Sequence, residues 1–446
     1  MALDQLVTAV QTLSAQGNYT ELCSQLNMAQ ELLAKNPGQL EGVLEALDMA
    51  QHTLGYLAVL VARLAQDNVE NFPDLLARCD RFMEAASPDQ IRFSPNSLSE
   101  LCHVLTAELV KRDCAIRGIS ILVRAARRLQ ATPSSLTPVH CDLAKLCLVS
   151  KCFTPALPFL DTDITIIAKD NQQVEALHLL LYYYYGGCIY AALKQFDRAL
   201  YFLEVAVTCP AAAVSHVMLE AYKKYQLVGL LVHGDKPKAY KENLALPKYT
   251  SPIVTKFLKA LCSAYTELVT AYHSNSASEL RGVVTKHQET FTADSNMGLV
   301  QQVVCSQTRT TIQRLTRTFI TLSLTDLAAR VGLATPQEVE REIVGMIESG
   351  SIHARISQAD GMVRFDTDPE SFSSPDMLRM LEEEVTRAIT LDSQVVGMEE
   401  ELLVSPQFVK KMAGARGEED EESGNRTSTS STAVSSGTGR LPGYSM

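Results

Sequence analysis

The stretch that most constrains the fold is residues 311–366, where helix and strand signals follow one another at close spacing. Ser323 carries a side-chain oxygen of the kind favoured at a helix N-cap, and the apolar stripe after it stops at Gly332. Thr335 and Pro336 then supply an N-cap and a first helical residue for a second helix. These signals predict two short helices in direct succession.

A pair of strands is expected next. Apolar residues alternate over 352–356, an Asp-Gly turn at 360–361 reverses the chain, and a second strand covers 362–365. One more helix is expected in front of the two capped helices, over 311–321. Three helices and a hairpin make a winged helix, a module often found in DNA-binding proteins.

The charge of the second capped helix argues against DNA. Segment 335–349 contains four glutamates and a single basic residue, Arg341. A helix that enters the major groove needs cationic groups to displace the counterions of the phosphate backbone. We therefore interpret the winged helix as a protein-docking module.

Length and charge favour a folded protein with protein partners. The chain has 446 residues, 46% of them hydrophobic, and a formal net charge of −11. This length allows two or three domains with buried cores, and the negative charge disfavours nucleic acid and anionic membranes as partners.

Neither a secretory signal nor a membrane span is expected. The N-terminus lacks a basic region followed by an apolar core, the apolar stretch 55–65 is broken by Arg63, and 227–232 is too short to cross a bilayer. We expect the chain in the cytoplasm and the nucleus.

A search for catalytic motifs is negative. The sequence has no phosphate-binding GxxxxGK[ST] loop, no GxSxG elbow and no HExxH pair. Its nine histidines never form the H-x-H pair of a zinc isopeptidase, and its eleven cysteines include no paired CxxC. Cys102 adjoins His103, but neighbouring positions on a helix point about 100° apart. We therefore predict no catalytic, cofactor-binding or metal-binding residues and no cofactor.

Residues 1–300 show apolar spacing of helical period and few strand signals, which is typical of an α-solenoid. The segment KCFTPALPFLD at 151–161 matches KQFDRALYFLE at 194–204, and both are expected to be second helices of helix pairs. Small residues around the second copy, including Gly187 and Ala199, fall near the spacing of a tetratricopeptide (TPR) unit. The tyrosine run 182–185 is assigned to helix packing rather than to a ligand site.

A long amphipathic helix is expected after the winged helix, over 375–412. An isolated helix is marginal in water, so its apolar stripe predicts docking, preferably in a bundle with helices of partner chains. The predicted interface residues on this helix are Leu378, Leu381, Val385, Leu391, Val395, Met398 and Leu402.

The last segment, 413–446, changes composition to an acidic cluster followed by a Ser, Thr and Gly tract. It is predicted to be disordered. Ser423, beside the acidic cluster, is a possible phosphorylation site, and the alternative is a tail that only aids solubility.

These parts in this order resemble the PCI-domain family, which occurs in the proteasome lid, the COP-nine signalosome and translation initiation factor three. The fold class is then mainly α: a degenerate TPR-like α-solenoid over 1–300, whose last part from about 195 belongs to the PCI domain, then a winged-helix subdomain over 301–370 and a C-terminal helix. Several segments are similar, more narrowly, to the subunit-three family of the COP-nine signalosome: TLSAQGNYTELC at 12–23, YYYYGGCIY at 182–190, AVSHVMLEAYKKY at 213–225, LPKYTSPIV at 246–254 and NMGLVQQ at 296–302.

The resemblance implies a non-catalytic scaffold of the signalosome, the complex that removes a ubiquitin-like modifier from cullins (deneddylation) and so regulates cullin-RING ubiquitin ligases. The metalloprotease centre is implied to lie on another subunit. Other subunits are the implied partners, through winged-helix edges and the C-terminal helical bundle, with cullin-RING ligases met indirectly. The strand residues expected at this interface are Met362, Val363, Arg364 and Phe365.

Two alternatives stay open at this point. A scaffold subunit of the proteasome lid has the same architecture. An RNA-associated subunit of initiation factor three would need a basic surface with aromatic residues, and the best basic stretch, around Lys236 to Lys241, is small.

Overall fold

The computed structural model describes residues 3–66, 71–130, 132–167, 174–211, 213–233, 246, 250–274, 276–366 and 374–411. The chain divides into two compact units, residues 1–366 and residues 367–446. The tail from 413 onward, with Ser423, and the basic stretch 236–241 lie outside the described residues.

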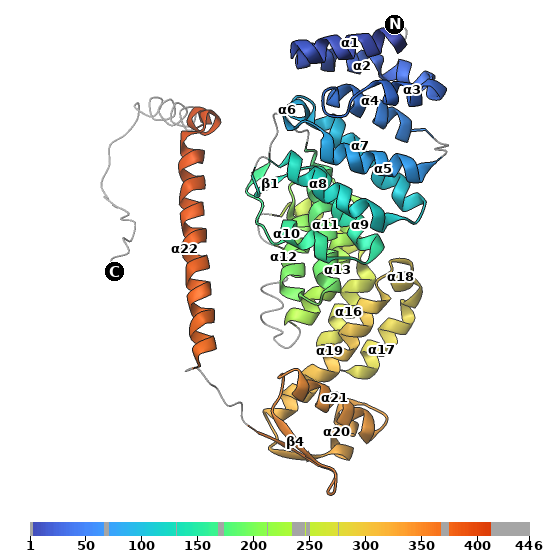
Figure 1. The fold of residues 1–446 in the computed structure, drawn as a ribbon. Coiled ribbons are helices and arrows are strands. Elements are labelled where there is room, and N and C mark those ends of the chain that lie inside the picture. Colours follow the sequence, from blue (N-terminus) through green and yellow to red (C-terminus); the bar gives the residue numbers. More distant parts are fainter. Residues whose placement is uncertain are drawn as a thin grey trace, which may run out of the picture. The chain divides into compact units, whose positions relative to one another are not determined.

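The first unit is a helical array that leads into a small mixed module. Figure 1 shows its helices stacked one after another, and helices close in sequence pack on each other, as in α11 with α12, α12 with α13 and α9 with α11. The prediction of a mainly α-helical solenoid is therefore confirmed. The helices of the array are α1 (Leu3–Gln16), α2 (Tyr19–Lys35), α3 (Leu40–Ala46), α4 (Thr53–Leu64), α5 (Phe72–Ala85), α6 (Pro88–Ile91), α7 (Pro95–Lys111), α8 (Ile119–Leu129), α9 (Val139–Ser150), α10 (Leu157–Leu160), α11 (Ala176–Ala192), α12 (Phe196–Thr208), α13 (His216–His233), α15 (Pro252–Leu261), α16 (Ser263–His273), α17 (Ala277–Lys286), α18 (Gln288–Ala293) and α19 (Met297–Thr316).

Several helices of the array end in the same way. A residue with positive φ follows the helix, and the next amide bonds to the carbonyl five residues back, which satisfies a free carbonyl at the helix end. The positive-φ residues are Gly17, Asp113, Lys151, Lys194 and Ser295, and the bonds run from Asn18 to Leu13, Cys114 to Leu109, Cys152 to Cys147, Gln195 to Tyr190 and Asn296 to Phe291, at 2.9 to 3.1 Å. These turns reverse the chain tightly between paired helices.

The two sequence copies share this turn, because Lys151 and Lys194 are their first residues. Their helices differ. The second copy forms α12, whereas the first forms only a 3₁₀ turn (Thr154–Ala156) and the single turn of α10. The expected second helix at 151–161 is therefore present only as this short helical segment over 154–160, in which Pro155 and Pro158 each stand at the start of a turn.

The α11–α12 contact depends on small residues. A Cβ atom added to Gly187 would lie 2.8 Å from Leu203 Cγ, closer than real Cβ contacts allow.

Tyr182 is buried and donates its hydroxyl hydrogen to the Phe159 carbonyl at 3.0 Å. The assignment of the tyrosine run to helix packing is confirmed for this residue, and a cluster of aromatic rings surrounds it.

Two short strands, β1 (Ser135–Leu136) and β2 (Ile166–Ile167), pair in parallel inside the array and were not expected.

The winged helix has its own core, which includes Ile312, Leu327, Val339, Ile343 and Val363, separate from the core of the array.

The winged helix contains β3 (Thr321–Ser323), α20 (Leu324–Val331), α21 (Pro336–Glu348), β4 (Ala354–Ser357) and β5 (Met362–Phe365). The predicted caps are confirmed: the amide of Asp326 donates to Ser323 Oγ at 3.0 Å, and that of Glu338 donates to Thr335 Oγ1 at 3.3 Å. Gly332 has φ of 74°, as its position after the helix requires.

The helix in front of the winged helix is longer than expected and starts earlier. It is the end of α19, which stops at Thr316, and residues 321–323 form a strand instead of the last turn of a helix over 311–321. The side chains of this strand alternate, with Leu322 buried and Thr321 exposed. Because the strand has only three residues, its period could not be recognised in the sequence.

The second unit contains α22 (Pro375–Val404), a helix of 30 residues capped by Ser374, whose hydroxyl oxygen accepts from the Met377 amide at 3.2 Å. The helix ends at Val404, because Ser405 precedes Pro406 and adopts extended backbone with ψ of 131°. Residues 406–411 are helical again, so the helix expected over 375–412 is interrupted at Ser405. Within the described parts of the chain, no helix is both long and apolar enough to cross a membrane.

Candidate interaction surfaces

The described residues contain no group of three or more His, Cys, Asp or Glu side chains that could hold a metal ion. Cys102 is fully buried, and burial raises the pKa of its thiol. His103 instead lies at the surface, where its Nδ1–H donates to Asp142 Oδ1 at 3.2 Å, and this hydrogen bond raises the pKa of His103. Cys102 and His103 therefore do not form a thiol–imidazole pair.

One buried histidine has a structural role. His140 is 2% exposed, its Nδ1 accepts from the Thr137 amide at 3.0 Å, and its ring packs edge-on against Phe159 and Tyr182. Burial lowers the pKa of His140 to about 4, so the ring is neutral at physiological pH. A neutral ring suits this packed position.

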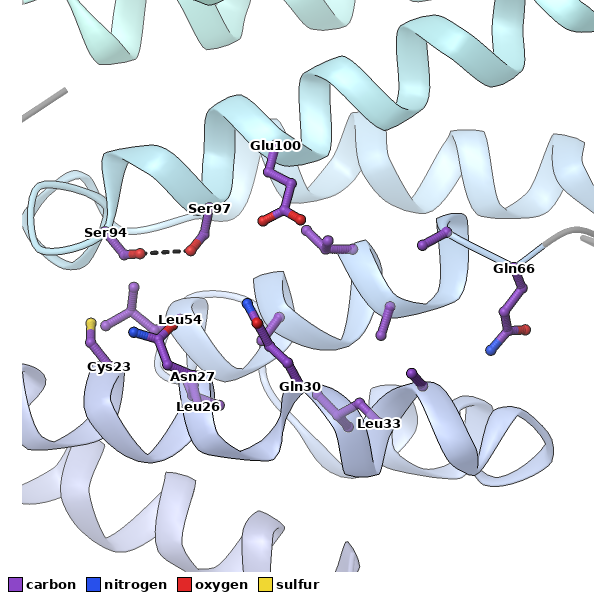
Figure 2. Close-up of a pocket in the computed structure, with 15 residues that line it drawn as sticks. Cys23, Leu26, Asn27, Gln30, Leu33, Leu54, Gln66, Ser94, Ser97 and Glu100 are labelled. Atoms are coloured by element: carbon purple, nitrogen blue, oxygen red, sulfur yellow. Dashed lines mark hydrogen bonds between the residues drawn. The ribbon is translucent and has the colours of Figure 1, made fainter. Parts of the chain in front are cut away.

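A groove of about 510 Å³ lies between α2, α4 and α7. Its floor is apolar and includes Leu26, Leu54 and Val61. Figure 2 shows Glu100 projecting from α7 toward α2, which carries Asn27 and Gln30. Among the described residues that line the groove there is no histidine, lysine or arginine, and burial raises the pKa of the Cys23 thiol, so Cys23 is not an activated nucleophile.

The strand order of the winged-helix sheet does not fit the interface expected from the sequence. Its strand order is β3-β5-β4, so β5 lies in the centre and pairs with both neighbours. The expectation that residues 362–365 present an open strand edge is therefore wrong, since a strand paired on both sides has no free backbone groups in the plane of the sheet. Val363 and Phe365 are also buried, which leaves Met362 and Arg364 as the exposed side chains of this strand.

Within the described residues, the other strand of the hairpin, β4, pairs with β5 alone and forms an edge of the sheet. The Asp366 amide donates to the His353 carbonyl at 2.9 Å. Because hydrogen-bonded and non-bonded pairs alternate along an antiparallel ladder, the amides and carbonyls of Ala354 and Ile356 point away from β5. These outward groups can pair with a strand from another chain.

The apolar face of α22 is exposed along the whole helix. None of the side chains of α22 is buried. The predicted interface residues Leu378, Leu381, Val385, Leu391, Val395, Met398 and Leu402 are all 45 to 68% exposed. Exposed apolar residues gathered in this way are typical of a surface that another protein covers.

A second apolar row on α22 was not predicted from the sequence. It comprises Ile389, Val396 and Leu403, which are 48 to 62% exposed and recur every seven residues. This spacing was a usable signal, because residues seven apart lie on nearly the same line of a helix. The two rows together widen the apolar face to about half of the helix circumference.

Comparison with known families first defines the class of the protein. A family model described as PCI domain matches residues 284–367, which include the winged helix and the helices before it. The chain is therefore a PCI-domain protein with an N-terminal helical array.

A second family model, described as COP9 signalosome complex subunit 3, N-terminal helical repeats, matches residues 16–254. A COP9 signalosome complex subunit 3 from Drosophila melanogaster is 43% identical over 433 residues, which cover 93% of this chain and 95% of the relative. One from Dictyostelium discoideum is 34% identical over 389 residues, which cover 87% and 91%. The chain belongs to the COP9 signalosome complex subunit 3 family.

Proposed function

We propose that the chain is a non-catalytic scaffold subunit of the COP9 signalosome. Its contribution is to hold other subunits in place for removal of the ubiquitin-like modifier from cullins, which regulates cullin-RING ligases indirectly. The observation that carries this proposal is the similarity to signalosome subunits over almost the whole chain. The proteasome lid and initiation factor three are not favoured, since both relatives are signalosome subunits.

The metalloprotease centre of the complex, in this proposal, lies on another subunit. The complex is expected to work in the cytoplasm and the nucleus, and the chain is not expected to bind nucleic acid or membrane.

The first proposed contact is the apolar face of α22, which would pack into a bundle with helices of other subunits. An apolar face about half the circumference wide exceeds the narrow seam of a two-stranded coiled coil. This width favours a bundle in which α22 touches more than one neighbour.

The second proposed contact is the winged-helix sheet. The outward backbone groups of β4 at Ala354 and Ile356 would pair with a strand of a neighbouring winged helix, and the exposed side chains Met362 and Arg364 would contact it from the face of the sheet. Val363 and Phe365 then act indirectly, by holding β5 in the core.

The test is purification of the tagged full-length chain from cells, with identification of every co-purifying protein and an assay of cullin deneddylation. We expect the other signalosome subunits and deneddylase activity in the eluate, and no activity from the chain purified alone. Recovery of proteasome-lid or ribosomal partners in place of signalosome subunits would contradict the proposal.

A further inference from the structure

The two halves of α22 differ sharply in residue type. Successive residues of a helix are rotated by about 100°, which places the large apolar residues from Met377 to Leu403 on one half of the circumference, about 180° wide. The other half is polar and carries both arginines of the helix, Arg379 and Arg387. Figure 1 shows α22 as one uninterrupted helix, so this division holds along its length.

The apolar half contains three polar residues, and all of them are acids: Glu384, Asp392 and Glu399. Asp392 and Glu399 are seven residues apart and lie near the middle of the apolar half. None of the three carboxylates makes an ion pair or hydrogen bond with any residue in the described part of the chain, whereas Arg379 on the polar half pairs with Asp376 and Glu383.

A protein that covers the apolar half must also cover these carboxylates. Removing a carboxylate from water is unfavourable unless a cation and hydrogen-bond donors replace the water. The apolar half has no lysine or arginine of its own to do this. The covering surface must therefore supply the positive charge.

We propose that the helices of other signalosome subunits that cover α22 place arginine or lysine side chains against Asp392 and Glu399. Two ion pairs one heptad apart would fix the axial register of α22 in the bundle, since any shift along the axis would leave the carboxylates buried against apolar residues. This inference rests on the proposed scaffold function and names the chemistry of the partner surface.

The test is a binding titration of the full-length chain against the remaining signalosome subunits, purified as one assembly. The variant D392K/E399K should raise the Kd at least about 30-fold. The variant D392L/E399L should also raise the Kd, because it leaves the partner cations without anions. The control E383K/E401K makes the same charge change on the polar half and should change the Kd by less than about threefold.

The variant D392L/E399L shows whether the two carboxylates pair with cations of the partner or are only buried or exposed without such pairs. If D392L/E399L binds as tightly as the unmodified chain, or more tightly, the acids have no cationic partners and the inference is wrong. The variant L381D/L391D separates this failure from failure of the bundle itself. If L381D/L391D loses binding while the acid variants do not, only the ion pairing is contradicted; if it also binds normally, both proposals fail.

Discussion

Helices α12 and α22 both carry apolar residues at helical spacing, but only α12 has them covered. Of its 13 residues, α12 buries Ala199, Leu200, Phe202, Leu203, Ala206 and Val207 between α11 and α13, whereas α22 buries none of its 30. Gly187 on α11 allows the close approach to α12, and α22 has no such prepared neighbour among residues 374–411, the described part of its own unit. An apolar pattern thus predicts that a face will be covered, but not by which chain.

The largest expected effect follows from placing charge on the face of α22. The variant L381D/L391D should weaken assembly with the other subunits at least about 100-fold, because aspartates would be buried without partners. The free energy of unfolding of residues 1–366 should not change, since both leucines are more than 40% exposed. Binding to the remaining subunits and urea unfolding measure the two quantities. The control T386D/T390D adds the same charges to the polar half and should assemble normally.

A substitution in the core of the winged helix should instead lower the stability of the first unit. Val363→Pro should destabilise the winged helix by about 3 kcal/mol or more, because Val363 is 0% exposed and its strand pairs on both sides. Proteolysis of the purified chain should then cleave within 321–365 before it cleaves the helical array. Resistance equal to that of the unmodified chain would show that β5 is not central to this core.

The stability of the helical array should also fall in acid because the array buries a histidine, a residue type that α22 lacks. An unfolded chain protonates His140 near pH 6.5, but the folded chain does so only near pH 4, so stability is lost as the pH falls from about 6.5 to about 4. The loss should reach about 2 kcal/mol by about pH 5. Urea unfolding of the unmodified chain and of His140→Gln at both ends of this range measures it. An equal loss of stability in His140→Gln would rule out this histidine as the cause.

The smallest effect on stability, less than about 1 kcal/mol, is expected at the open edge of the sheet. Ala354→Pro removes an amide hydrogen that points away from β5, so the winged helix should stay folded. Pairing with a neighbouring strand should weaken, which retention of the partner subunits measures. Ala354→Val keeps the amide and is the matched control. Unchanged retention of partners by Ala354→Pro would place the winged-helix contact elsewhere.

Much of the fold could be predicted because its signals are local. The caps at Ser323 and Thr335, the hairpin turn and the stripe of α22 all depend on residues close in sequence, and the structure contains each of them. The order of strands could not be predicted in this way. It depends on β3, a three-residue strand whose pairing with β5 closes the sheet over a distance of about 40 residues in sequence.

The candidate surfaces also differ in whether residues close in sequence define them. The apolar stripe of α22 was visible in the sequence, because period alone defines it. The choice of 362–365 as an open edge failed because edge position is a property of the whole sheet, not of the strand. The groove beside Glu100 was also not predicted, since its lining comes from α2, α4 and α7, which only the fold brings together.

The central claim is that other subunits complete the exposed face of α22. Hydrogen–deuterium exchange of the full-length chain, alone and in the assembled complex, tests it most directly. We expect the amides of residues 375–404 to exchange rapidly in the free chain and to become protected in the complex, while the buried helices α11 to α13 are protected in both. Exchange of 375–404 that is equally slow in the free chain, or equally fast in the complex, would contradict the claim.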